Sequence, residues 1–188
     1  MTQYNDLQLI KRQFFALRNG IIADTLRKSG SPFRMIFGLN IPQIVESASQ
    51  WKGNADFARR LWADTATRES MMAACVIMPF EEMTLDEARK WIASSPCYET
   101  TDFLCHQVLR HLPEARILAG ELINSSDTTL RYAAVRLMWN IYMRDPAGIL
   151  EMAKKGADDN DPVNSRVAAS LVEEIRFMLD DSECEDCR

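Results

Sequence analysis

The sequence predicts an all-α protein built from stacked pairs of antiparallel helices, that is, an α-solenoid or α-α superhelix. Three segments share one pattern, a helix that contains two adjacent alanines: Ala73/Ala74, Ala133/Ala134 and Ala168/Ala169. The pairs are 60 and 35 residues apart, which corresponds to two repeats and then one. A repeat of about 30–45 residues indicates helix pairs that stack on one another, because a single amphipathic pair cannot bury its own apolar face.

The first part of the chain has clear helix boundaries. Leu7, Ile10, Phe14 and Leu17 recur at helical spacing, and a glycine follows them. A short second helix stops before the Ser-Gly-Ser-Pro segment 29–32. Residues 33–42 then read as a loop whose proline begins the next helix.

The rest of the chain consists of short helices with proline at most of the joints. Asn54, Thr84 and Asp127 are the expected N-caps. No useful length of sequence alternates apolar and polar residues with period two, so no strands are expected. The predicted helices span about residues 4–18, 22–28, 42–50, 54–64, 67–78, 84–93, 98–111, 113–123, 128–143, 146–154 and 162–179.

We expect one repeat domain over residues 1–179, followed by an acidic, disordered tail over residues 180–188. The formal net charge is −5, but the tail holds five acids and one arginine. Residues 1–179 carry 21 Lys+Arg against 22 Asp+Glu and are therefore nearly neutral. Sixteen of the basic residues are arginine, which suits both phosphate contacts and buried ion pairs. Composition therefore neither supports nor excludes a DNA partner.

No signal peptide and no apolar run of about 18 residues is present, so we expect a cytoplasmic protein without a membrane partner. The two histidines, His106 and His111, have only Cys105 nearby, which is too few ligands to predict zinc. Cys184 and Cys187 have C-x-x-C spacing but stand alone in the acidic tail. No glycine-rich phosphate loop is found. We therefore expect no metal and no nucleotide cofactor.

Four segments in this order resemble the HEAT-like DNA alkylation repair enzymes, a family of α-solenoid glycosylases for alkylated purines. The first is FGLNIP at 37–42, and the second is FARRLW at 57–62 followed by Arg68. The third runs from Asp86 through Trp91 to Tyr98 and Asp102, and the fourth is the repeat that contains Arg131. The resemblance covers most of residues 4–179.

The resemblance implies a concave basic surface that holds duplex DNA by its backbone, with an aromatic residue and a carboxylate against the lesion. It assigns the catalytic carboxylate to Asp102 and the aromatic wall to Tyr98, where the family has tryptophan. It assigns phosphate contacts to Arg131 and, in the last repeat, Arg166. A second family tryptophan falls at Leu171, so this chain departs from the family's pattern there.

Each of these residues also has a purely structural interpretation. Asp102 near a helix N-terminus stabilises the helix dipole, Tyr98 could pack on its neighbours, and Arg131 could pair with an acid of the next repeat. The resemblance implies a DNA repair protein that binds alkylated duplex DNA and hydrolyses the N-glycosidic bond of alkylated purines. The alternative is a non-catalytic HEAT-like repeat module that binds a protein or a nucleic acid.

Overall fold

The computed structural model of the protein describes the backbone of residues 5–185 and the side chains as far as residue 180. Within this range the chain folds into eleven α-helices and four short 3-10 helices. The β-type backbone pairing in this range consists of one isolated parallel bridge between Met35 and Thr67. The predicted all-α fold of antiparallel helix pairs is confirmed.

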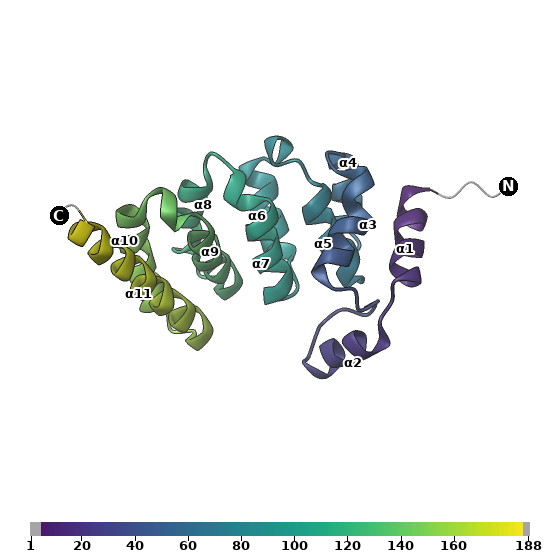
Figure 1. The fold of residues 1–188 in the computed structure, drawn as a ribbon, viewed down its shortest axis with the longest axis horizontal. Coiled ribbons are helices and arrows are strands. Elements are labelled where there is room, and N and C mark those ends of the chain that lie inside the picture. Colours follow the sequence, from purple (N-terminus) through teal and green to yellow (C-terminus); the bar gives the residue numbers. More distant parts are fainter. Residues whose placement is uncertain (1–4, 186–188) are drawn as a thin grey trace. The chain divides into compact units, whose positions relative to one another are not determined.

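The helices form two compact units, which meet in the sequence at Val108 and Leu109. The sequence predicts one domain over residues 1–179, and the division of this range into two units was not part of that prediction. Figure 1 shows the helices in sequence order. Unit 1 holds α1 (Asp6–Ala16), α2 (Gly20–Lys28), α3 (Ile41–Ala48), α4 (Ala55–Trp62), α5 (Arg68–Ile77), α6 (Leu85–Ser94) and α7 (Tyr98–Gln107).

In unit 1 helix α5 is the central element. It packs against its pair partner α4 and also against α3 and α7. Helices α4 and α6 meet through stacked indole rings, since the Trp62 and Trp91 centroids are 4.4 Å apart with an interplanar angle of 5°. The four 3-10 helices of the described chain lie at short joints between α-helices. In unit 1 they are Ser49–Trp51 and Phe80–Glu82, and in unit 2 they are Leu109–His111 and Tyr142–Arg144.

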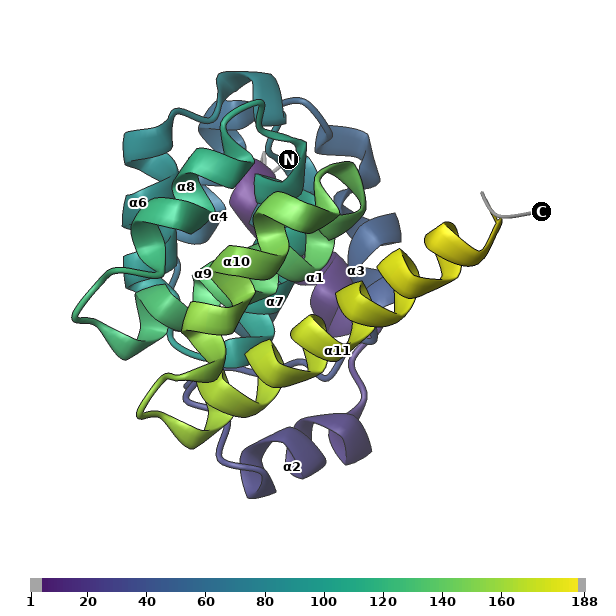
Figure 2. The same cartoon turned by 90° about the vertical axis from the view of Figure 1, so that its left-hand side faces the viewer.

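Unit 2 repeats the same arrangement with α8 (Ala115–Leu122), α9 (Thr128–Ile141), α10 (Pro146–Ala157) and α11 (Pro162–Glu185). Helix α8 packs on α9, α10 packs on α11, and α9 also contacts α11. Figure 2 faces this unit and shows α10 beside α11. Helix α11 continues to Glu185, whereas the sequence predicts its end at residue 179; the last three residues of the predicted tail lie outside the described residues.

The alanine pairs belong to the packed interior between helices. Both alanines of the first two pairs and Ala168 of the third are fully buried. A side-chain carbon placed on Gly156 of α10 would lie only 3.0 Å from the Cβ of Ala168 on α11. Larger residues at these positions would push the helices apart, because a packed interior cannot absorb added volume.

A buried carboxylate fixes the loop between α2 and α3. Glu69, on the first turn of α5, is completely buried and accepts hydrogen bonds from the backbone N–H groups of Phe37, Gly38 and Leu39 at 3.0, 2.9 and 3.3 Å. The neighbouring Arg68 guanidinium lies 3.1 Å from the same carboxylate. These partners compensate the charge, which would otherwise be costly to bury.

Successive helix pairs are joined by side chains about one repeat apart in the sequence. In three places an arginine holds a carboxylate with two parallel hydrogen bonds, and we call these pairs the repeat-spaced forks: Arg59–Glu87, Arg68–Glu99 and Arg131–Asp159, with separations of 28, 31 and 28 residues. Two indole N–H groups donate hydrogen bonds with a similar spacing. One donates to a serine hydroxyl 32 residues away, and the other donates to a backbone carbonyl 28 residues away. The repeats are therefore joined by polar contacts as well as by apolar packing.

Substituting Gly38 should destabilise the protein more than substituting Gly30. Both glycines have a positive φ, +81° and +83°, so an alanine at either is strained by about 1–2 kcal/mol. A Cβ on Gly38 would also lie 2.1 Å from the carbonyl oxygen of Asn19, whereas a Cβ on Gly30 meets nothing within 4 Å. We expect urea unfolding to show a further loss of about 1–3 kcal/mol for Gly38→Ala. Equal losses for the two variants would contradict the close approach.

Replacing Asp159 should remove an acid-sensitive part of the stability. The hydrogen bond from the Arg131 guanidinium holds the pKa of the Asp159 carboxyl well below its usual value of 3.8. A carboxyl whose folded pKa is lowered stabilises the fold above its unfolded pKa, and that contribution fades as the pH falls through the folded pKa. Urea unfolding should therefore give Asp159→Asn a lower free energy of unfolding than the wild type, by a constant amount between about pH 5 and pH 8. Below about pH 4 this difference in free energy should become smaller.

Asp158→Asn is the matched control, since Asp158 is the exposed acid immediately before Asp159. We expect the Asp158 variant to follow the wild-type profile. A gap for Asp159→Asn that does not change with pH would mean that the lost stability does not depend on the carboxylate charge.

Candidate functional site

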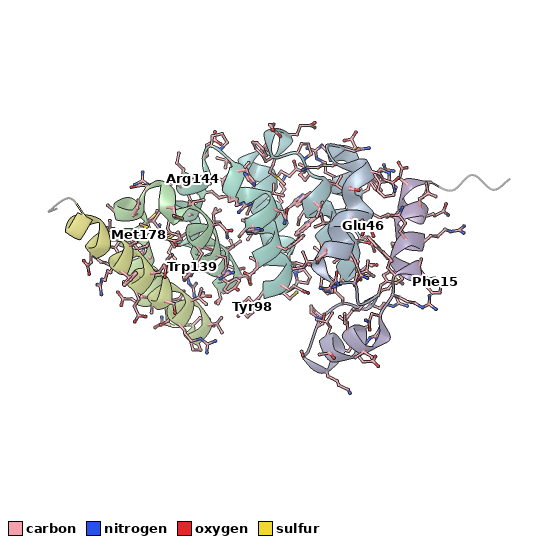
Figure 3. All side chains as sticks on the ribbon, in the orientation of Figure 1. Phe15, Glu46, Tyr98, Trp139, Arg144 and Met178 are labelled. Carbon is pink, nitrogen blue, oxygen red and sulfur yellow. The ribbon has the colours of Figure 1, made fainter. Side chains whose placement is uncertain are left out.

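Helix α7 carries three polar or aromatic residues in one stripe. Tyr98, Asp102 and His106 are four residues apart, which places neighbouring Cβ atoms about 5–6 Å from each other on one helix face. Tyr98 is 45% exposed, Asp102 is partly exposed and His106 is exposed. Figure 3 shows Tyr98 at the first turn of the helix. The structure thus brings the two predicted residues Tyr98 and Asp102 together on an accessible face of unit 1.

The opposite face of α7 is buried and fixes the stripe in place. The side chains of Phe103, Leu104 and Cys105 are buried there. At the first turn, the hydroxyls of Thr100 and Thr101 lie 2.6 and 2.9 Å from that of Ser95, which is itself buried. The orientation of α7 is therefore determined from its core side.

The start of α7 is also tied to α5. Glu99, the residue after Tyr98, receives two hydrogen bonds from Arg68 at 2.8 and 2.6 Å. Burial lowers the pKa of Arg68, but the hydrogen bond and charge of Glu99 outweigh it and raise the pKa of the guanidinium. The ion pair holds the helix turn that carries Tyr98. Sequence reasoning missed the role of Glu99, although its spacing of 31 residues from Arg68 matches the repeat.

The other predicted residues belong to unit 2. Arg131 on α9 forms the fork with Asp159 at 2.6 and 3.0 Å, and it donates two more hydrogen bonds to the carbonyls of Ser125 and Ser126 at 3.0 and 2.9 Å. The Asp159 side chain is only 4% exposed and also accepts from Asn164 at 3.1 Å. Arg131 thus lies within a network that ties α9 to the turn before α11, and its assignment to phosphate stays a prediction.

Arg166 and Leu171 lie on α11. Arg166 is exposed and makes no ion pair with any residue that the structure describes, so its guanidinium is available to an external anion. Leu171 is fully buried and belongs to the core. It therefore contributes no wall to a surface site, in keeping with the departure from the family's tryptophan noted in the sequence.

The described residues offer a particular chemistry. A partly exposed carboxylate beside an aromatic face can hold a cationic ring and stabilise positive charge that develops near it. Over residues 5–180, the structure gathers no group of three or more His, Cys, Asp or Glu side chains that could hold a metal ion. In the same part of the chain, each helix is too short or too polar to cross a bilayer.

Comparison with solved structures finds a chain with the same fold. It is described as "a new family of proteins related to the HEAT-like repeat DNA glycosylases with affinity for branched DNA structures". The similarity has a TM-score of 0.64, covers 95% of each chain and carries 16% sequence identity, so it establishes the fold. A search of curated proteins finds no match.

A family model of the DNA alkylation repair enzymes matches residues 10–168. The match spans both units and includes α7 with its stripe as well as the Arg131 repeat. The resemblance drawn from the sequence motifs is confirmed, and the chain belongs to the DNA alkylation repair enzyme family.

Proposed function

We propose that this protein binds duplex DNA and hydrolyses the N-glycosidic bond of alkylated purines, with Asp102 as the catalytic carboxylate. Family membership supports a role in DNA alkylation repair. The observation that supports this reaction is that an exposed aromatic residue and a partly exposed carboxylate lie one turn apart on α7. The aromatic face of Tyr98 would contact the cationic purine or its sugar, and Asp102 would lie beside the anomeric carbon.

The chemistry follows from the charge of the substrate. When the bond between the sugar C1′ and the purine nitrogen breaks, its electron pair moves to the alkylated base and neutralises the base. The positive charge then lies on the deoxyribose, where the carboxylate of Asp102 stabilises it. A water molecule adds to C1′ and gives its proton to Asp102 or to solvent, leaving an abasic sugar and a free base.

DNA affinity would come from arginines whose charge is not already used within the fold. Arg166 meets this condition among the predicted phosphate ligands. Arg131 would have to release Asp159 before it could bind a phosphate, because its Nε and one Nη are committed to that carboxylate. Arg166 is therefore the stronger candidate for a contact with the DNA backbone.

The reaction is tested by replacing Asp102 with asparagine. The wild type should release alkylated purine from methylated duplex DNA, and Asp102→Asn should slow the release by about 10²–10³-fold because it removes a preorganised charge. The binding of undamaged duplex, followed by fluorescence anisotropy, should persist in the variant.

Asp86→Asn is the matched control, because Asp86 is an exposed acid on α6 whose described partner is Arg89 on the next turn. This variant should release purine at the wild-type rate. Absence of release by the wild type, even at a large excess of protein over DNA, would rule out the catalytic role.

A second candidate is a protein that binds branched DNA without cleaving it. Leu171 favours this function, because it stands where the family has a second tryptophan and therefore offers no second aromatic wall to a lesion. The structural neighbour with affinity for branched DNA supports it. Anisotropy titrations should then show tighter binding to a four-way junction than to a linear duplex of the same length, together with no purine release. Equal affinity for both DNAs would exclude this candidate.

A further inference from the structure

We infer that a basic, aromatic hollow at the N-terminal end of unit 1 binds unpaired nucleotides. This inference rests on the proposed DNA partner and adds a second contact region, separate from the stripe on α7. The hollow has a volume of about 750 Å³ and lies between the end of α1, the start of α2 and the loop before α3. Its principal side chains are Phe15, Arg18, Arg27, Arg34, Met35 and Phe37.

The charge of the hollow favours an anion. Three arginines line it, and its lining contains no Asp or Glu. Arg34 is exposed and forms no ion pair with a described residue. Arg27 shares its charge with Asp24 at 2.9 Å, but both side chains are largely exposed, so that pair is weak. At least one full positive charge is therefore available to a phosphate.

The apolar surface of the hollow favours bases whose faces are open. Phe15 is 57% exposed and Met35 is 45% exposed. The Arg18 guanidinium carbon lies 3.9 Å from the Phe15 ring centroid, and the guanidinium donates to the Phe15 carbonyl at 2.8 Å, so the two side chains form a cation–π contact. Figure 3 shows Phe15 at the end of α1, directed outward. Aromatic rings and guanidinium planes are the surfaces on which unpaired bases stack, whereas a closed duplex keeps its base faces inside.

The hollow is held in shape before any ligand arrives. The backbone of Met35 is fixed by hydrogen bonds with Ala66 at 2.8 Å and Arg68 at 3.1 Å, and the Phe37 carbonyl accepts from Asn19 at 2.8 Å. The buried Glu69 holds the next backbone N–H groups of the same loop. A preformed site loses less entropy on binding than a loop that must first become ordered.

The test compares three DNAs by fluorescence anisotropy at one salt concentration: a blunt duplex, the same duplex with a single-stranded flap, and the single strand alone. The wild type should bind the flapped duplex more tightly than the blunt one. Phe15→Ala should weaken binding to the flapped duplex and the single strand by about 5-fold or more, because one base–aromatic stack contributes about 1–3 kcal/mol. Its affinity for the blunt duplex should not change.

Arg34→Ala should weaken binding to the flapped duplex and should also flatten its salt dependence by about one unit of log–log slope, the signature of a lost phosphate contact. Phe177→Ala and Lys52→Ala are the matched controls. Phe177 is a 67% exposed aromatic residue on α11, and Lys52 is an exposed cation of unit 1 outside the hollow. Neither control should alter the preference for the flap.

The outcomes separate this inference from the proposed function. If the wild type binds the blunt duplex but Phe15→Ala keeps the full preference for the flap, the hollow does not bind unpaired nucleotides and the proposed function stands. Equal weakening of all three DNAs by Phe15→Ala would also overturn the inference. Binding to vesicles of anionic phospholipid that is lost in Phe15→Ala, with DNA binding unchanged, would assign the hollow to a lipid surface instead. A wild type that binds no DNA overturns both.

Discussion

Within each unit, neighbouring helix pairs are joined by side chains that lie about thirty residues apart in the sequence. Without those partners a pair would expose its apolar face and leave several buried polar groups unsatisfied. The repeat-spaced forks and the two indole hydrogen bonds supply the polar part of this dependence, with separations of 28 to 32 residues. The buried alanines supply the apolar part by letting neighbouring helices come close. Both kinds of contact occur within each unit.

This dependence changes the meaning of the arginine content. Arginine is the commonest basic residue of the chain, and in a DNA repair family it is natural to assign it to phosphate. Three arginines are instead held in forks, and Arg116 on α8 pairs with Asp145 at 2.8 Å. In residues 1–179, whose net charge is nearly zero, these arginines are thus paired with carboxylates of the same fold. Arg34 and Arg166 are two of the exposed arginines for which no ion pair is described, and the proposed DNA affinity should depend on them.

Much of the fold could be predicted from the sequence because it follows from local patterns. The alanine pairs, the caps and the prolines gave the number and order of the helices. The end of α11 could not be predicted from composition. Its acidic last turns resemble a solvated tail, yet the helix is anchored by buried Leu171, Val172 and Ile175, and an anchored helix propagates at little further cost.

The site was predictable only where it lies on one element. Tyr98 and Asp102 are one turn apart on α7, so their common face follows from helix geometry alone. The sequence left open that Arg131 pairs with an acid of the next repeat, and the structure shows that this acid is Asp159. Choosing Asp159 among the acids near residue 160 required knowledge of how the repeats stack. The hollow around Phe15 could not be predicted, because residues 15–18 and 34–37 meet only through the loop that Glu69 holds.

The fixed spacing of the forks limits how the length of the chain can vary. A residue inserted between Arg131 and Asp159, within α9 or α10, would rotate one partner by about 100° around its helix and separate guanidinium from carboxylate. An insertion in the joint between α9 and α10, where the 3-10 helix Tyr142–Arg144 lies, can be absorbed without rotating either partner. Insertions and deletions in homologous chains should therefore concentrate at such joints, and a homologue with a longer helix should have lost both members of the fork together.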